Sequence, residues 1–335
     1  MRGRVARRGD EPAMSELNSE RVLVDVARRW GAKAGVRVEL LGDGWVLRLS
    51  RGDRVRYVHG YTFDLNGAGT AGVLRDKAAA SEAMARAGVA AVEHRFVPHP
   101  DLAKFMPEVG GLEAARAGFE AFGCDVVVKD NAGTGGRGVT RARTVAELEA
   151  AAGGCFARGQ SAALCRFLSI ERETRLIMLD GACVLAYSKE RLTVRGDGER
   201  AVRSLVEARA EAEGPSGPAA RCLANADEGT TAAWARVPAK GEVVLVNWRH
   251  NLGQGADVRF EDAASGAMAG RLALAMSAVA ALNLTFGSVD VVRVAGREMV
   301  LEVNAGVMVD AVAKSPGGPA IAKRVYEQAL SRMFE

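Results

Sequence analysis

A predicted apolar strand that ends in lysine constrains this chain more than any other feature. Residues 125–129 read Asp-Val-Val-Val-Lys and lead directly into a loop with four glycines between residues 133 and 138. Glycine lets the main chain approach a ligand closely, and the N–H groups of such a loop can cradle phosphate oxygens beside the lysine ammonium. The lysine precedes the glycines, so the pattern is neither a Walker loop nor GxGxxG. A hairpin tip without a ligand is the alternative interpretation.

Short strands and helices are mixed along the whole chain of 335 residues. Hydrophobic periodicity and turn residues predict helices at residues 20–34, 76–88, 112–122, 144–152, 202–212, 268–282 and 320–333. They predict strands at residues 36–41, 45–50, 54–59, 125–129, 163–170, 174–187, 243–247, 288–294 and 298–303. Residues 66–69 and 213–218 are predicted as loops. This mixture indicates an α+β fold class with two or three small lobes.

The composition argues against several classes of protein. Hydrophobic residues make up 48% of the chain and charged residues 26%, which is ordinary for a globular protein. The five cysteines lack CxxC spacing, so neither a disulfide framework nor a zinc site is indicated. No apolar run reaches the ~18 to 20 residues of a membrane span. A basic tail over residues 1–18 lacks the clustered aromatics of a nucleic-acid site, and a cytoplasmic protein is predicted.

The predicted hairpin over residues 288–303 carries polar side chains among valines and leucines. Asp290 lies on its first strand, and Glu302 and Asn304 lie on its second. A period of two points Glu302 and Asn304 to one face, and Asp290 can join them across the strand pair. Two carboxylates and an amide oxygen suit Mg²⁺. Because buried acids without a partner are costly, a metal site explains them better than the alternative of two surface acids.

Taken in order along the chain, these motifs resemble the ATP-grasp superfamily. The series is Lys77, Lys129 with its glycine-rich loop, Glu173-Thr174-Arg175, Asp290 and Glu302-Val303-Asn304. The spacing from Asp290 to Asn304 is similar to that of D-alanine–D-alanine ligases and of ligases that add glutamate to ribosomal protein tails. Residues 187–205 resemble cyanophycin synthetases and bifunctional glutathione-synthesising ligases more closely. The resemblance extends over residues 73–312.

The resemblance implies an ATP-grasp fold, in which two α/β lobes clasp ATP, with a short N-terminal lobe. The implied parts are a flexible basic tail (1–18), a small N-terminal lobe (19–74), a central lobe with a glycine-rich lid (75–163) and a C-terminal lobe with the metal site (164–335). Family members are often dimers or tetramers, so a homodimer and a homotetramer are both open.

The resemblance also assigns roles to single residues. The residues that would contact the ATP phosphates are Lys77, Lys129, Gly133, Thr134, Gly135, Gly136 and Gly138. The segment Arg166, Phe167 and Leu168 would meet adenine, and Glu171 and Glu173 would hold the ribose. Arg175 and Arg191 would face the γ-phosphate and the acyl phosphate, with Asn251 near the transferred group. Asp290, Glu302 and Asn304 would bind two Mg²⁺ ions, with Mn²⁺ as an alternative.

The implied activity is ATP-dependent ligation of a carboxylate to an amine through an acyl phosphate, with release of ADP and phosphate. The substrates would be an amino acid, a peptide or a related small molecule. A small-molecule kinase and a non-catalytic nucleotide-binding module are the alternatives. The chain departs from the family pattern at Cys165, where many relatives carry an acid, in the short region before Lys77, and after Asn304, where Pro-Gly is absent.

Overall fold

The computed structural model describes residues 21–106, 111–136 and 138–335. The predicted basic tail (1–18) lies outside the described residues, as does Arg137 of the glycine-rich loop. Contacts group the described chain into two compact units, one of residues 21–65 and 306–335 and the other of residues 66–305. The predicted boundaries at residues 18, 74 and 163 are finer than this grouping and stay predictions. Within the described ranges, no helix is long and apolar enough to cross a membrane.

The first unit joins a small sheet to helices from both ends of the chain. Its antiparallel sheet has the order β1 (Arg37–Leu41), β2 (Val46–Arg51), β3 (Arg54–His59) and β4 (Thr62–Phe63). Its helices are α2 (Val22–Ala34), α12 (Asp310–Ala313) and α13 (Gly318–Arg332). The indole N–H of Trp30 on α2 donates to Ser331 on α13, over 3.0 Å. This bond and the apolar faces of the two helices fix the unit.

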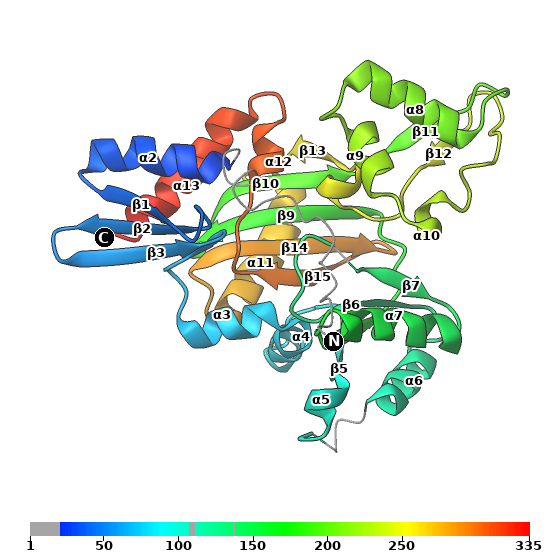
Figure 1. Ribbon diagram of the computed structural model, residues 1–335, viewed down its shortest axis with the longest axis horizontal. Coiled ribbons are helices and arrows are strands. Elements are labelled where there is room, and N and C mark those ends of the chain that lie inside the picture. Colours follow the sequence, from blue (N-terminus) through cyan, green and yellow to red (C-terminus); the bar gives the residue numbers. More distant parts are fainter. Residues whose placement is uncertain (1–20, 107–110, 137) are drawn as a thin grey trace, which may run out of the picture. The chain divides into compact units, whose positions relative to one another are not determined.

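A five-stranded antiparallel sheet forms the centre of the second unit (Figure 1). Its order is β13 (Asp257–Phe260), β10 (Ala182–Glu190), β9 (Arg172–Leu179), β14 (Phe286–Val294) and β15 (Arg297–Asn304). Three helices pack on one face: α3 (Ala68–Arg75), α4 (Lys77–Arg86) and α11 (Ala269–Leu282). Because strand side chains alternate, Leu176 and Val289 enter this core while Arg175 and Asp290 point to the opposite face.

A four-stranded antiparallel sheet carries the predicted lysine strand. Its order is β5 (Arg95–Val97), β8 (Ala162–Arg166), β6 (Val126–Asp130) and β7 (Thr140–Ala142). Helices α6 (Leu112–Ala121) and α7 (Val145–Ala157) supply its core, and α5 (Pro100–Ala103) follows β5. Thr144 caps α7 as predicted by accepting from the Glu147 N–H. The Glu147 carboxylate accepts from the Arg143 N–H, one residue before the capping-box position.

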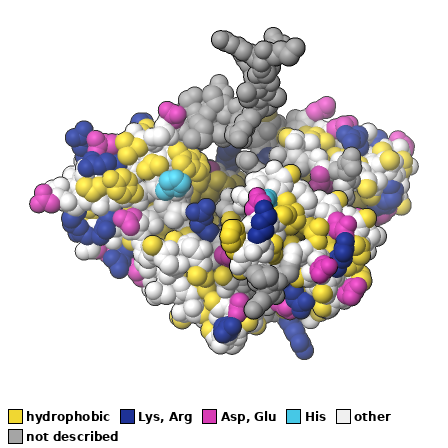
Figure 2. Space-filling view, turned by 60° about the horizontal axis from the view of Figure 1, so that its bottom comes forward, with side chains coloured by type: hydrophobic (Ala, Val, Ile, Leu, Met, Phe, Trp, Pro, Cys, Tyr) yellow, Lys and Arg dark blue, Asp and Glu magenta, His cyan; other side chains and the backbone are white. Residues whose placement is uncertain are grey.

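A segment between β10 and β13 has a hydrophobic core of its own. It contains β11 (Thr193–Arg195), α8 (Val202–Glu213), α9 (Pro218–Asn225), α10 (Glu228–Thr231), β12 (Val243–Leu245) and the 3-10 turn η2 (Leu252–Gln254). A second 3-10 turn, η3 (Gly266–Met268), leads into α11. Figure 2 shows acidic, basic and apolar side chains interspersed on one face of the molecule. The predicted α+β fold class is confirmed.

Candidate active site

The five-stranded sheet presents a row of charged side chains on the face opposite its helices. Asp290 and Glu302 are directly opposite one another in the β14–β15 register, and Arg175 on β9 is opposite Asp290. Asp290 is 1% exposed and accepts two hydrogen bonds from the Arg175 guanidinium, at 2.7 and 2.6 Å. Lys189 Nζ lies 3.2 Å from the same carboxylate and also binds Glu173. The row is therefore a buried ionic network.

The electrostatics of this network follow from burial and pairing. Burial alone would raise the pKa of Asp290, but Arg175 and then Lys189 hold it below its ordinary value. Glu173, only 6% exposed, has a raised pKa because burial outweighs the attraction of Lys189. Its predicted role at the ribose stays a prediction. Glu171, also predicted there, is exposed and accepts from the Gly296 N–H over 3.2 Å.

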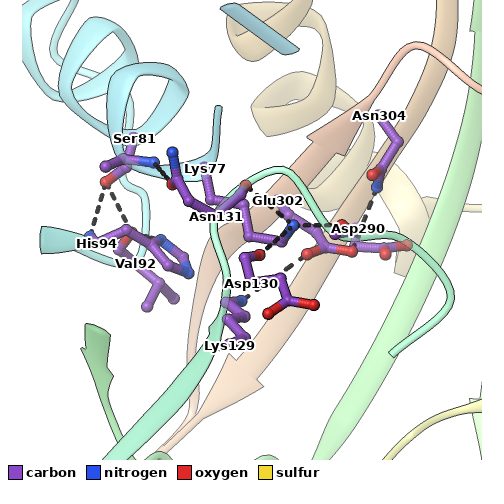
Figure 3. A network of polar contacts seen from close by, with 12 residues as sticks. Lys77, Ser81, Val92, His94, Lys129, Asp130, Asn131, Asp290, Glu302 and Asn304 are labelled. Carbon is purple, nitrogen blue, oxygen red and sulfur yellow. Dashed lines mark hydrogen bonds and ion pairs between the residues drawn. The ribbon is translucent and has the colours of Figure 1, made fainter. Parts of the chain in front are cut away.

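Lys129 and Glu302 join the two sheets of the second unit (Figure 3). Lys129 Nζ on β6 lies 3.8 Å from a carboxylate oxygen of Glu302 on β15. Asn304 is on the same side of β15, and its amide donates to Glu302 over 3.3 Å. Burial alone would raise the pKa of Glu302, but Lys129 and then Lys77 lower it to about 2. The carboxylate is therefore ionised at any physiological pH.

Lys77 approaches the same point from the first turn of α4. Its ammonium donates to three backbone carbonyls of the loop after β6, those of Asp130, Asn131 and Gly133, at 3.2, 3.3 and 2.5 Å. The Asn131 side chain accepts from the Ala78 N–H over 3.2 Å and so fixes the loop to the start of the helix (Figure 3). A helix N-terminus and two lysines together favour an anion.

The glycine-rich loop is held by side chains that come from beyond β12. The Asn251 amide donates to the Gly135 carbonyl over 3.0 Å, and the Arg249 guanidinium donates to the Val139 carbonyl over 2.7 Å. Arg249 is itself held by Asp227 at 2.6 Å. Gly136 has a φ of 72°, and a Cβ there would lie 2.0 Å from the Asn251 amide nitrogen. Glycine is thus required at residue 136, where the loop contacts Asn251. Within the described chain, Thr134 is exposed.

The segment after β8 crosses from the smaller sheet to the larger one. Arg166 ends β8 with an exposed side chain, and the Phe167 N–H donates to the Asp125 carbonyl over 2.9 Å. The Phe167 ring lies beneath the Arg141 guanidinium, at 3.5 Å, and edge-on to Trp248, at 5.5 Å. Partly buried apolar side chains gather around this crossing. They are Val139, Phe167, Leu168, Ile170, Trp248, Val294, Met299 and Leu301.

Solved structures resemble this chain, whereas no protein-family model and no curated sequence matches it. A bifunctional glutathione synthetase from Pasteurella multocida aligns with 96% of the chain at 17% identity and a TM-score of 0.53. The chain has the ATP-grasp fold. It spans 44% of the length of that synthetase. A D-alanine–D-alanine ligase from Bacillus anthracis aligns with 79% of this chain and over 67% of its own length, at 13% identity and a TM-score of 0.49. The D-cycloserine synthetase DcsG aligns with 78% of this chain and over 71% of its own length, at 20% sequence identity and a TM-score of 0.45.

The donor atoms at Asp290, Glu302 and Asn304 fit the Mg²⁺ that the ATP-grasp fold implies. Carboxylate and amide oxygens are hard ligands of the kind Mg²⁺ takes. Asp290 uses three of its roughly four acceptor positions on Arg175 and Lys189, which leaves one. The side chain of Glu302 is 24% exposed. Among the described residues, no three His, Cys, Asp or Glu side chains form a metal cluster. The third oxygen of this set would come from the side-chain amide of Asn304.

The sequence analysis named most residues of this site but did not identify Lys189. The structure gathers Lys77, Lys129, Asp290, Glu302 and Asn304. Arg191 lies farther along, at the end of β10, in a pocket that shares Lys189 with this site. Pairing β9 with β10 straight back from the turn between them would put Ser188 opposite Glu173 and turn Lys189 to the other face of the sheet. A bulge between Cys183 and Leu185 shifts the register by one residue, so that Ser188 lies opposite Thr174 and Lys189 comes beside Glu173. The strand pattern in the sequence does not reveal such a bulge.

Proposed function

We propose that this protein is an ATP-dependent carboxylate–amine ligase that forms an amide bond through an acyl phosphate. The observation that carries the proposal is the contact of Lys129 with Glu302. It brings the lysine before the glycine-rich loop to the acid beside Asn304, on the sheet face that also holds Asp290. Cations for a polyphosphate and oxygens for a divalent metal thus share one site. The match to a bifunctional glutathione synthetase supports the ligase class at the level of fold.

The residues suit the charge changes that phosphorylation of a carboxylate requires. A carboxylate resists attack by an amine because its leaving group would be oxide, and a phosphate is a far better leaving group. Lys77 and Lys129 would hold phosphate oxygens, and the glycine-rich loop would cover them and exclude water. Two Mg²⁺ ions, or Mn²⁺, at Asp290, Glu302 and Asn304 would supply charge neutralisation at the transferred group.

The nucleoside would bind beside the crossing segment. The apolar side chains around Phe167, Leu168 and Trp248 offer flat, partly buried surface for a purine. Within residues 166–168 the Phe167 N–H is already bound to the Asp125 carbonyl, so hydrogen bonds to the base would come from the other backbone groups of this segment. Cys165 is buried at this point, so recognition would rest on the main chain rather than on an acid.

Product analysis tests the proposal. The full chain is incubated with MgATP and single carboxylates, with and without a pool of amines, and ADP release and product mass are followed. We expect ADP release that depends on both substrates and a product with the mass of an amide. A stable phosphorylated carboxylate would instead identify a kinase, and no ADP release with any pair would contradict the enzyme assignment. Cytoplasmic location, oligomeric state and the absence of a nucleic-acid partner stay predictions.

A further inference from the structure

A charged pocket of about 320 Å³ lies where β9 begins and β10 ends. Four cations line it together with two carboxylates, and Leu245 of β12 adds an apolar wall. The charged and polar lining residues are Arg172, Lys189, Arg191, Arg259, Glu171, Glu190, Thr193 and His250. The volume is at the lower end of small-molecule sites, so it suits a compound of amino-acid size rather than a whole nucleotide. The pocket adjoins the candidate active site through Lys189, whose ammonium also contacts Asp290.

Two of the four cations in this pocket form no ion pair with a described residue. Lys189 is held by Glu173 and Asp290, and Arg259 is held by Glu190 at 3.0 Å and Glu261 at 2.8 Å. The other lining acid, Glu171, lies 3.5 Å from Arg293. Within the described part of the chain, the guanidinium groups of Arg172 and Arg191 form neither an ion pair nor a hydrogen bond. With both lining acids held by other arginines, the two guanidinium groups favour an anion.

Arg191 is the better placed of the two. Its side chain is half-buried, and burial lowers its pKa below the ordinary value. Glu190, the nearest carboxylate along the chain, attracts Arg191 and partly offsets this effect, but its ion pair is with Arg259. His250 fixes this end of β10 by donating from Nδ1 to the Lys189 carbonyl over 2.8 Å. Burial lowers the pKa of His250 to about 4, so the ring is neutral and adds no charge of its own.

We propose that Arg191, aided by Arg172, binds a carboxylate of the substrate other than the one that reacts, so that the enzyme acts on small acidic compounds. This inference rests on the proposed ligase function. A planar guanidinium can take both oxygens of a carboxylate, and each charge-assisted bond discriminates strongly against a neutral amide. A phosphoryl group of the nucleotide offers the same chemistry and is the competing source of the anion.

Equilibrium titration without turnover tests the pocket. Glutarate and its monoamide glutaramate are titrated by calorimetry into the full chain, and the Mg²⁺ complex of a non-hydrolysable ATP analogue is titrated in parallel. We expect glutarate to bind at least about tenfold more tightly than glutaramate, and Arg191→Gln to abolish that difference. Arg191→Lys should keep part of it. Arg195→Gln is the matched control, because that exposed arginine on β11 lies outside the pocket lining and, among the described residues, its side chain donates to the Gly241 carbonyl alone.

The affinity for the ATP analogue, which carries the γ-phosphate, separates the two sources of the anion and also verifies folding. We expect it to be equal in wild type and in all three variants. Equal affinities of the wild type for glutarate and glutaramate, or no glutarate binding, would overturn the inference. So would a loss of affinity for the ATP analogue in Arg191→Gln as large as its loss of glutarate affinity. Because these titrations need no catalysis, their failure would leave the ligase proposal standing.

Discussion

Lys189 lies between the carboxylates of Glu173 and Asp290 and is itself 7% exposed. Burial and the neighbouring Arg175 would lower the pKa of Lys189, but the two carboxylates raise it above its ordinary value. The ammonium therefore stays charged inside the protein. Removing one member of a buried ionic set leaves an uncompensated charge, which costs far more than the set contributes in net stability. The residue that the sequence did not reveal is thus one on which the site depends.

Substituting Lys189 with methionine should destabilise the protein strongly. The change keeps the volume but leaves Glu173 without its cation, and we expect a loss of about 3–5 kcal/mol in the free energy of unfolding. Urea denaturation followed by circular dichroism measures it. The double variant Lys189→Met with Glu173→Gln should recover part of the loss, since the stranded charge is gone. A single variant as stable as wild type would show that the ionic set is dispensable.

Substituting Glu302 with glutamine should abolish turnover while the fold persists. The amide keeps the shape and removes the charge that pairs with Lys129 and would bind the metal. We expect the rate of ADP release to fall by more than about 100-fold. Mutation of residues that only hydrogen-bond to a metal ligand already lowers metal affinity or activity by about 10- to 100-fold. Glu211→Gln on the exposed surface of α8 serves as control. Wild-type rates in Glu302→Gln would refute the metal assignment.

Single residues of the site differ in how well local sequence encodes them. Asp290, Glu302 and Asn304 could be predicted because acids within an apolar hairpin at fixed strand parity need a shared partner. The partner of Arg175 could not be predicted. Whether its guanidinium binds a phosphate or Asp290 depends on the register between β9 and β14, which are far apart in sequence. The same holds for Arg249, which the structure assigns to Asp227 and Val139.

The glycine-rich loop is the element whose geometry bears most directly on activity. Gly136 combines a φ of 72° with close approach to Asn251. Gly136→Ala should therefore strain the loop by about 1 kcal/mol or more and break the Asn251 contact, which lowers the affinity for ATP. Nucleotide titration by calorimetry measures the effect, and little change in melting temperature is expected because the loop is exposed. Unchanged affinity would argue against a role for the loop.

Gly153→Ala supplies the matched control for that substitution. Gly153 lies inside α7, where a Cβ would meet open space. Alanine lowers the entropy of the unfolded chain and favours helix, so we expect a gain of up to about 1 kcal/mol in the free energy of unfolding, with unchanged activity. A loss of stability at this position would contradict the helix assignment.

Elements with strong periodicity could be predicted, and elements made by packing could not. Helices α2, α8 and α11 and the hairpin β14–β15 lie within a few residues of their predicted ranges. Helix α3 was predicted in part as a loop, because its start, Gly67-Ala68-Gly69, has poor helix propensity and no capping side chain. Leu74, buried in the core with α4 and α11, holds it in place. Such tertiary support is invisible to a local pattern.

At the scale of the molecule, distant segments form one compact unit from residues 21–65 and 306–335. The Arg51 and Arg54 guanidinium groups donate to the Phe334 carbonyl, at 2.9 and 2.6 Å, and lie over its ring. Each segment alone predicts its own helix or strands, but the pairing between them spans most of the chain. The fold class could be inferred from motifs in the middle of the chain, and this unit could not.

The stability of the whole molecule should rise with pH between about 4 and 6.5 through His250. Burial lowers the pKa of this ring to about 4, whereas an unfolded histidine titrates near about 6.5. Within that window the unfolded state binds more protons than the folded state, so acidification favours unfolding. We expect a loss of about 2 kcal/mol in the free energy of unfolding from pH 7 to pH 5 through this residue alone.

The variant His250→Gln isolates this contribution, since glutamine can still donate to the Lys189 carbonyl but does not titrate. Urea denaturation of both proteins between pH 5 and pH 7 should show a shallower dependence in the variant. His94, whose pKa burial lowers further, contributes equally to both proteins and cancels in the comparison. Measurements stay above pH 5 because below it the carboxylates with depressed pKa values, Asp290 and Glu302, would begin to contribute. Parallel pH profiles for the two proteins would show that His250 is not held neutral at the end of β10.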